Sequence, residues 1–220
     1  MSEKTNDQKP LRKDTEGLLA HSTMVWNEKI YQTDKIANGF MPDYERILAP
    51  FRQQAVRVLE IGVFKGGSCK LWSDFFSHPQ SRIIGLDLVL PGDAAPTDPK
   101  VTLKQCDQND AVCLREIAER FGPFDVVIDD GAHRFDETRN CYQVLFEHVN
   151  SGGYYIIEDW GVGYWKNQQH IYGSANGNTM VTLITSIMHS IPNVPIAGYQ
   201  IILDTHKCLA FFRKGTPWQS

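Results

Sequence analysis

The sequence lacks the features that mark several large classes of protein. No apolar run in the 220 residues approaches the roughly 20 residues that a membrane-spanning helix needs. Basic residues are not in excess, because 22 lysines and arginines stand against 26 aspartates and glutamates, for a net charge of -4. That balance argues against a protein that holds nucleic acid by broad attraction to phosphate. We therefore expect neither a membrane partner nor a nucleic-acid partner.

Cysteine is scarce, and its distribution argues against two kinds of cross-linked protein. The five cysteines are odd in number and scattered, with no C-x-x-C pair: Cys69, Cys106, Cys113, Cys141 and Cys208. This usage predicts neither a disulfide framework nor a zinc cluster, and it fits a reducing cytoplasm. Residues 1–17 are polar with mixed charge, unlike a signal peptide. We expect a disordered lead-in there and a cytoplasmic protein.

What the sequence does contain is a long alternation of strand and helix patterns. The composition is 42% hydrophobic and 22% charged, as in ordinary globular proteins, and the length suits one large domain. Short apolar runs predict strands over 55–62, 82–88, 101–107, 124–130 and 152–159, and a hairpin over 197–215. Helical patterns fall between them, over 66–78, 110–122, 136–150 and 178–191.

This alternation predicts an α/β fold. We expect a Rossmann-like, doubly wound sheet of seven strands, mostly parallel, with an antiparallel C-terminal hairpin at one edge. Residues 55–220 would form this domain. Residues 18–54 would form an N-terminal helical cap or lid, in which Pro42 starts a short helix that ends before Pro50. Ligands of such sheets bind beyond the carboxyl ends of the strands, so the residues after each strand are candidates for a site.

The first two strands end in residues that suit a nucleoside-bearing cofactor. Glu60 and Gly62 end the first strand, and Ser68 opens the following helix. Glycines let the backbone approach a ligand closely, and a helix start offers free N–H groups. Asp87 ends the second strand, where an acid commonly holds a ribose diol. The alternatives are a turn without a ligand and a solvated loop acid.

The next two strands end in acidic residues, in I-D-D-G-A-H and I-E-D-W. If these strands are neighbours, Asp130, Glu158 and Asp159 converge at one rim. Carboxylates that close repel one another, so a divalent cation, a basic side chain or raised pKa values must compensate. All-oxygen ligation favours Mg²⁺, Mn²⁺ or Ca²⁺ over zinc, and Mg²⁺ is the default where a small substrate completes the shell. In the alternative arrangement one acid faces inward and the others cap helices.

Two further features lie beside these acids. His133 follows Asp130 by three residues, where a neutral imidazole could accept a proton from a substrate held by the metal. An isolated loop histidine is otherwise ordinary polar surface. The loop over 160–172 is rich in aromatic residues. It is either a lid that offers flat apolar faces to a sugar or a surface for packing between subunits.

With these motifs in place, the chain resembles class I S-adenosylmethionine-dependent methyltransferases. V-L-E-I-G-V-F-K-G-G-S is similar to their first motif, and the C-terminal hairpin to their last two strands. More narrowly, I-D-D-G-A-H and I-E-D-W resemble the metal-dependent sugar O-methyltransferases of macrolide biosynthesis, of the mycinamicin and macrocin type. Y-Q-T-D-K resembles their G-T-D-K element, with Gln32 replacing the glycine. K-Q-C-D-Q-N-D resembles their G-D-Q-S-D motif, with Cys106 replacing the glycine.

The resemblance implies a role for each matching residue. Mg²⁺ (or Mn²⁺) would be held by Asp130, Glu158 and Asp159, and His133 would be the general base. S-adenosyl-L-methionine would be surrounded by Thr33, Glu60, Gly62, Ser68, Asp87, Gln108 and Asp130. The resemblance also implies a homo-oligomer and a place in antibiotic biosynthesis.

These expectations describe an O-methyltransferase that acts on a hydroxyl of a sugar, a glycosylated natural product or another polyhydroxylated metabolite. A bound cation would lower the pKa of the hydroxyl and hold it in line with the sulfonium methyl group, and His133 would accept the proton. Three alternatives stay open. They are a catechol-like acceptor, a nicotinamide oxidoreductase and a non-catalytic nucleoside-binding module. The absence of a G-x-G-x-x-G fingerprint counts against the oxidoreductase.

Overall fold

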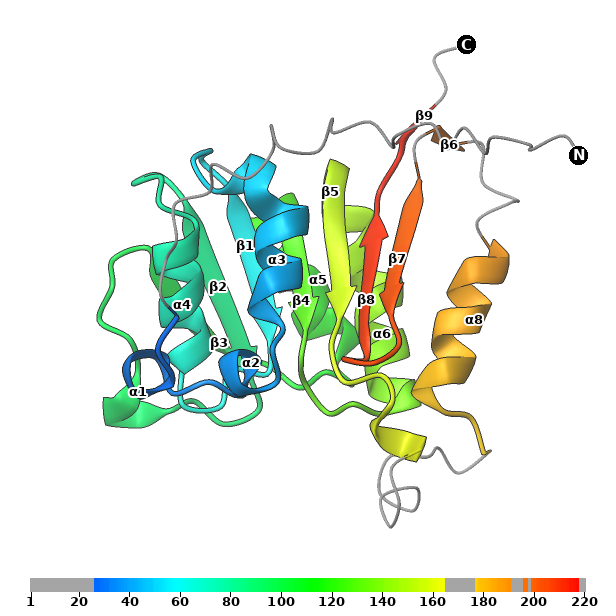
Figure 1. The fold of residues 1–220 in the computed structure, drawn as a ribbon, viewed down its shortest axis with the longest axis horizontal. Helices are drawn as coiled ribbons and strands as arrows, with labels where there is room; N and C mark the ends of the chain where they lie inside the picture. The colour runs from blue at the N-terminus through cyan, green and yellow to red at the C-terminus, as the bar shows by residue number, and fades with distance from the viewer. Residues whose placement is uncertain (1–25, 165–176, 191–195, 198, 218–220) are drawn as a thin grey trace, which may run out of the picture.

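The computed structural model describes residues 26–164, 177–190, 196–197 and 199–217. The expected lead-in over 1–17 and the part of the aromatic loop over 165–172 therefore lie outside the described residues. Seven strands form one sheet in the order β3-β2-β1-β4-β5-β8-β7 (Figure 1). They are β1 (Arg57–Ile61), β2 (Arg82–Asp87), β3 (Val101–Gln105), β4 (Phe124–Asp129), β5 (Val149–Ile157), β7 (Gln200–Asp204) and β8 (Leu209–Arg213). A separate short pair joins β6 (Ile196–Ala197) to β9 (Thr216–Pro217).

The predicted fold class is confirmed. Strands β1 to β5 pair in parallel, and the C-terminal hairpin β7–β8 runs antiparallel to them. The second strand of the hairpin, β8, lies between β5 and β7, so it joins the hairpin to the sheet. Strand order reverses between β1 and β4, since β2 and β3 continue on one side and β5 on the other. Sheets of this kind bind ligands at such a switch point.

Helices cover both faces of the sheet. The longer ones are α3 (Met41–Leu48), α4 (Gly67–Phe75), α5 (Ala111–Phe121), α6 (Phe135–Leu145) and α8 (Met180–Ser190). The short ones are α1 (Glu28–Tyr31) and α2 (Asp34–Ala37), with 3-10 turns η1 (Ala49–Phe51), η2 (Gly92–Ala94), η3 (Phe146–His148) and η4 (Val162–Tyr164). Pro42 lies in the first turn of α3, as the sequence predicts, and Gly122 caps the end of α5.

Two apolar cores follow from the alternation of side chains along the strands. On one face, Val58 of β1 packs with residues of α3 and α4, among them Trp72. On the other face, Leu59 packs with residues of α5, α6 and α8, among them Leu114. Figure 1 shows α3 and α4 in front of the sheet, with α5 and α6 behind it. No described helix is long and apolar enough to cross a membrane.

One pair of cysteines corrects the expectation drawn from cysteine usage. Cys106 follows β3 and Cys113 lies in the first turn of α5, and the two form a disulfide with their Cα atoms 6.1 Å apart. The two cysteines are seven residues apart in the sequence, and they meet because the chain reverses direction between the strand and the helix. Cys69, Cys141 and Cys208 are free. The cross-link is a single one, so the fold depends on its apolar cores.

Candidate active site

A cavity of about 720 Å³ opens at the carboxyl edge of the sheet, at the switch point between β1 and β4. Its volume lies within the range of about 300–1,000 Å³ that is usual for small-molecule sites. Most of the residues expected around a cofactor line it: Thr33, Gly62, Ser68, Asp87, Gln108 and Asp130. His133 lines it as well. The fold thus brings residues from Thr33 to His133 together around one cavity.

The turn after β1 passes close to the backbone that follows β4. Gly62 has a φ of +86°, a value that L side chains rarely adopt. A Cβ atom at this position would lie 2.0 Å from the backbone oxygen of Asp130. At Gly67, the first residue of α4, a Cβ atom would lie 1.8 Å from the backbone oxygen of Tyr31. The two glycines therefore allow three chain segments to meet beneath the cavity.

Asp87, at the end of β2, fixes the shape of this turn. Its Oδ2 accepts hydrogen bonds from the backbone N–H groups of Val63, at 3.0 Å, and Phe64, at 2.8 Å. Its Oδ1 accepts one from the backbone of Val89, at 3.2 Å. The carboxylate is thus held by backbone donors from two loops at the edge of the cavity. Its contact with a ribose stays a prediction from the sequence.

Glu60 lies in the interior beneath the turn and is fully buried. Its carboxylate accepts hydrogen bonds from Ser68 Oγ at 2.7 Å and from Trp72 Nε1 at 2.9 Å. Burial raises the pKa of Glu60, and the nearby ammonium of Lys35 opposes that rise. Glu60 does not appear among the residues that line the cavity. The structure therefore places it as a support for the start of α4.

Thr33 and Gln108 hold their segments of the cavity wall. Thr33 is the N-cap of α2, and its Oγ1 accepts a hydrogen bond from the backbone of Lys35. Gln108 accepts a hydrogen bond from the backbone of Ala132 at 2.7 Å and donates one to Asp129 Oδ1 at 3.1 Å. The loop after β3 is thereby tied to the loop after β4, which carries His133.

Three polar side chains gather at the ends of β4 and β5. The two strands are neighbours, with Asp129 paired to Ile157, so the residues that follow them meet at one rim. One ligand atom each from Asp130, His133 and Asp159 lies within 4.8 Å of the others. His133 Nε2 is 3.7 Å from Asp130 Oδ1 and 3.9 Å from Asp159 Oδ2. Two carboxylates and an imidazole at this spacing could hold a divalent cation.

The backbone at this cluster adopts an unusual conformation. His133 and Asp159 both have a φ of +52°, in the left-handed region that non-glycine residues seldom occupy. Each such residue costs of order 1–3 kcal/mol, and such residues concentrate at functional sites. Both of these aim a side chain at the same point. The coincidence supports a functional interpretation of the cluster.

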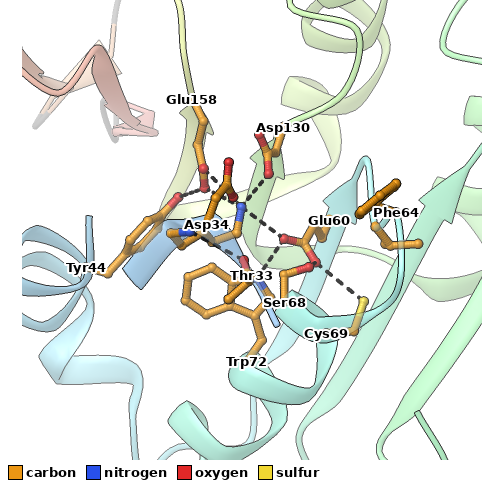
Figure 2. A network of polar contacts seen from close by, with 12 residues as sticks. Thr33, Asp34, Tyr44, Glu60, Phe64, Ser68, Cys69, Trp72, Asp130 and Glu158 are labelled. Atoms are coloured by element: carbon orange, nitrogen blue, oxygen red, sulfur yellow. Dashed lines mark hydrogen bonds and ion pairs between the residues drawn. The ribbon is translucent and has the colours of Figure 1, made fainter. Parts of the chain in front are cut away.

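Glu158, the third acid of the rim, faces a different partner. It is 1% exposed, and Lys35 Nζ lies 2.9 Å from its Oε1 and 3.0 Å from its Oε2. Tyr44 Oη also donates to Glu158 Oε1. The same ammonium lies 2.5 Å from Asp130 Oδ2 and 3.4 Å from Glu60 Oε1. Figure 2 shows the carboxylates of Glu60, Asp130 and Glu158 pointing toward one centre.

Burial and these charges shift the ionisation of the rim. Burial lowers the pKa of Lys35, but the charges of Asp130, Glu158 and Glu60 outweigh it and hold the pKa well above its usual value. Burial and the charge of Asp130 raise the pKa of Glu158. Burial raises the pKa of Asp159 to about 6, with a further rise from Asp130 and an opposing effect of His133. The rim therefore carries Lys35 as an ammonium.

Sequence reasoning named a basic side chain as one means of compensation but did not identify it. Lys35 ends the Y-Q-T-D-K element, and its partners lie 95 and 123 residues further along the chain. Tyr44, in α3, was also missed. The only available signal for Lys35 was its place in an element shared with the resembled family. No local pattern indicates that α2 delivers this side chain to the rim.

The strand order, with β8 inserted antiparallel beside β5, is the fold of class I S-adenosylmethionine-dependent methyltransferases. The MycE methyltransferase from the mycinamycin biosynthetic pathway, solved in complex with Mg, SAH and mycinamycin VI, is similar in structure. The two share a TM-score of 0.72 and 35% identity, over 86% of this chain and 52% of that one. No family model matches the sequence.

Similarity in sequence points to the same group of enzymes. Mycinamicin VI 2''-O-methyltransferase of Micromonospora griseorubida is 39% identical over 197 residues, which are 80% of this chain and 48% of that protein. Demethylmacrocin O-methyltransferase of Streptomyces fradiae is 42% identical over 133 residues, which are 57% of this chain and 33% of that protein. The resemblance to macrolide sugar O-methyltransferases is thus confirmed. The chain spans about half or less of the length of these relatives.

Proposed function

We propose that the chain is an O-methyltransferase that moves a methyl group from S-adenosyl-L-methionine to a hydroxyl of a sugar or a glycosylated natural product, with Mg²⁺. The observation that carries this proposal is the meeting of Asp130, His133 and Asp159 beside a cavity at the switch point of the sheet. Two further relatives are named for acceptors that carry a rhamnosyl or an olivosyl group, which supports the same acceptor class.

The cavity suits the cofactor. It has room for a nucleoside with an amino-acid side chain, and Gly62 leaves no Cβ in the way at its base. Bound there, S-adenosyl-L-methionine would contact Thr33, Ser68, Asp87 and Gln108, which line the cavity. Glu60 would support the turn from below through its hydrogen bond with Ser68.

The acidic rim, formed by Asp130, Glu158 and Asp159, suits the cation. Asp130 and Asp159 offer carboxylate oxygens close to one another, which are the ligands that Mg²⁺ prefers. Glu158 would be the third carboxylate ligand, through a lone pair that is not used by Lys35, which bonds both of its oxygens, or by Tyr44, which bonds Oε1. When bound, Mg²⁺ would lower the pKa of an acceptor hydroxyl.

His133 would accept the proton of the acceptor hydroxyl. Its imidazole is 19% exposed, at the wall of the cavity and next to both carboxylates. The methyl group forms a bond to the hydroxyl oxygen as its bond to the cofactor's sulfur breaks, and the proton moves to a ring nitrogen of His133. The products are a methyl ether, S-adenosylhomocysteine and a proton. The cytoplasmic location, the homo-oligomer and the domain boundaries remain predictions from the sequence.

The test is methyl transfer from labelled S-adenosylmethionine to defined acceptors. Mycinamicin VI and demethylmacrocin represent glycosylated macrolides, and a simple catechol represents the alternative acceptor. We expect label in a glycosylated macrolide with Mg²⁺ and none with EDTA. Label in the catechol alone would overturn the sugar acceptor but retain the methyltransferase. Cofactor binding without transfer to any acceptor would favour a non-catalytic module.

A further inference from the structure

We infer that the ammonium of Lys35 holds Asp130 and Glu158 in place when no divalent ion is bound. A divalent ion can then bind to and leave the acidic rim without disturbing the fold. The inference rests on the proposed function in taking these two carboxylates as metal ligands. It makes Lys35 a positioning residue, which acts through the carboxylates and touches neither acceptor nor cofactor. The ion would then serve the acceptor hydroxyl and would not be needed for folding.

The position of Lys35 is fixed from both ends of its side chain. Its backbone N–H is bound by the N-cap Thr33 at the start of α2, and its side chain is fully buried. Its ammonium ends within 3.4 Å of oxygens of Glu60, Asp130 and Glu158. A buried ammonium with three carboxylate partners has little freedom to move, because each departure leaves a charge unpaired.

The two carboxylate oxygens of Asp130 face different partners. One faces Lys35, and the other faces the candidate metal ligands His133 and Asp159. Oδ2 lies 2.5 Å from Lys35 Nζ, whereas Oδ1 faces His133 Nε2 at 3.7 Å. The ammonium therefore determines the rotation of this carboxylate. It turns the second oxygen toward the point at which Asp159 also presents an oxygen. Only one oxygen of Asp130 is thus left open to an ion.

Glu158 is held in the same way from two elements. Lys35 bonds both of its oxygens, and Tyr44 Oη of α3 donates to Oε1. Tyr44 is itself fully buried against the rings of Trp72 and Phe211, at 4.8 Å and 5.6 Å between centroids. These contacts place Glu158 before any ion arrives. Figure 2 shows Tyr44 meeting Glu158 at one side of the network.

Removing the ammonium of Lys35 would make the stability of the protein depend on a divalent ion. The buried acids Glu60 and Glu158 and the half-buried Asp130 would lose their shared positive charge, and an uncompensated buried charge is strongly destabilising. A divalent cation at the rim could replace the lost charge. Stability that is insensitive to EDTA in the parent protein would then become dependent on the ion.

The experiment measures Tm for the parent and for Lys35→Met, without cofactor or acceptor, in EDTA and in excess Mg²⁺ or Mn²⁺. We expect the variant to melt about 10 °C lower than the parent in EDTA. We expect the ions to restore much of that loss, while shifting the parent little. An ion-induced shift in the variant no larger than that of the parent would overturn the inference.

Lys70→Met is the matched control. Lys70 forms an ordinary surface pair with Asp74, and its side chain is 46% exposed. Its loss should change Tm little and leave the response to ions unchanged. Because no methyl transfer is measured, an inactive protein could still confirm the role of Lys35. The absence of turnover would instead count against the proposed function.

A second measurement tests the inference even if the Lys35→Met protein folds poorly. Glu158→Gln removes one rim charge, so it should reduce the damage done by Lys35→Met. Urea unfolding of both single variants and the double variant in EDTA gives the coupling between the two positions. We expect a smaller loss from Lys35→Met in the Glu158→Gln background, or recovery of soluble protein there. Additive losses, or insoluble protein in both backgrounds, would contradict the inference.

Discussion

The two halves of the site balance their negative charge in different ways. At the ends of β1 and β2, Asp87 is met by backbone N–H groups of Val63 and Phe64, only 24 and 23 residues away. At the ends of β4 and β5, Asp130 and Glu158 share the ammonium of Lys35, which is 95 and 123 residues away. The first half is built from local turns. The second depends on a helix from the other end of the chain.

Under the proposed function, this difference separates cofactor binding from the chemical step. The half at β1 and β2 can keep its shape through its own loops, as a site for a cofactor requires. The half at β4 and β5 concentrates charge, strained backbone and a histidine, as a site for bond making requires. Changes in one half should therefore affect cofactor binding, and changes in the other should affect turnover.

The largest effect is expected at His133. His133→Ala should lower kcat by about 10²- to 10⁴-fold, because a positioned base contributes that much. The affinity for S-adenosylhomocysteine should stay within about threefold, since general-base catalysis acts on the acceptor. Single-turnover assays and calorimetry measure the two quantities. His206→Ala, at an exposed turn, is the control and should be active. Normal turnover in His133→Ala would remove this residue from the mechanism.

Gly62 connects the two halves, so its substitution should disturb both. Gly62→Ala would drive a Cβ atom into the backbone oxygen of Asp130 at a positive φ. We expect a loss of about 3 kcal/mol or more in the free energy of unfolding. Gly39→Ala is the matched control, because Gly39 also has a positive φ, of +71°, but nothing lies within 4 Å of its added Cβ. Urea unfolding that gave equal losses for both would refute the close approach.

Substitutions of Asp87 and Asp159 should have opposite effects on cofactor binding and metal binding. Asp87→Ala should weaken S-adenosylhomocysteine binding by about 10- to 100-fold, through the loss of charge-assisted hydrogen bonds. It should leave the binding of Mn²⁺ in place. Asp159→Asn should do the reverse, because its carboxylate is one of the proposed metal ligands. Calorimetry with each ligand checks both, and a variant that lost both ligands equally would contradict the division.

The smallest effect is expected at a partly exposed pair outside the site. Lys207 Nζ lies 2.5 Å from Asp43 Oδ2 and ties α3 to the turn between β7 and β8. Burial raises the pKa of Asp43, but hydrogen bonds from Lys207 and Arg46 outweigh it and lower the pKa. This stability is present above the unfolded pKa near 4 and is lost as pH falls through the folded pKa.

Asp43→Asn should therefore cost at most about 1 kcal/mol at pH 7, since solvent screens such pairs. The difference from the parent should shrink as pH falls below about 4. Urea unfolding across pH gives the result. A penalty that stayed constant with pH would show that the pair contributes through packing, and the contrast with buried Lys35 would lose its electrostatic basis.

The sequence predicted the sheet because each strand is a short apolar run, closed by a turn or a polar residue. The same property brought Asp130, His133 and Asp159 together, since neighbouring parallel strands end at one edge. The partner of Glu158 could not be predicted, because it depends on how α2 packs and not on any local pattern. The Cys106–Cys113 disulfide was missed for a related reason. Spacing alone did not show that the strand and helix return so closely.

The most direct test of the account is a thermal-shift titration with S-adenosylhomocysteine, in Mg²⁺ and then in EDTA. At 100 times Kd a ligand adds about 2.7 kcal/mol, which for a domain of this size raises Tm by roughly 5–10 °C. We predict that rise for the parent protein in both conditions, and a rise of about half that size or less in Asp87→Ala at the same ligand concentration. No rise in either condition would contradict the methyltransferase account and would favour the other nucleoside-binding or non-catalytic alternatives.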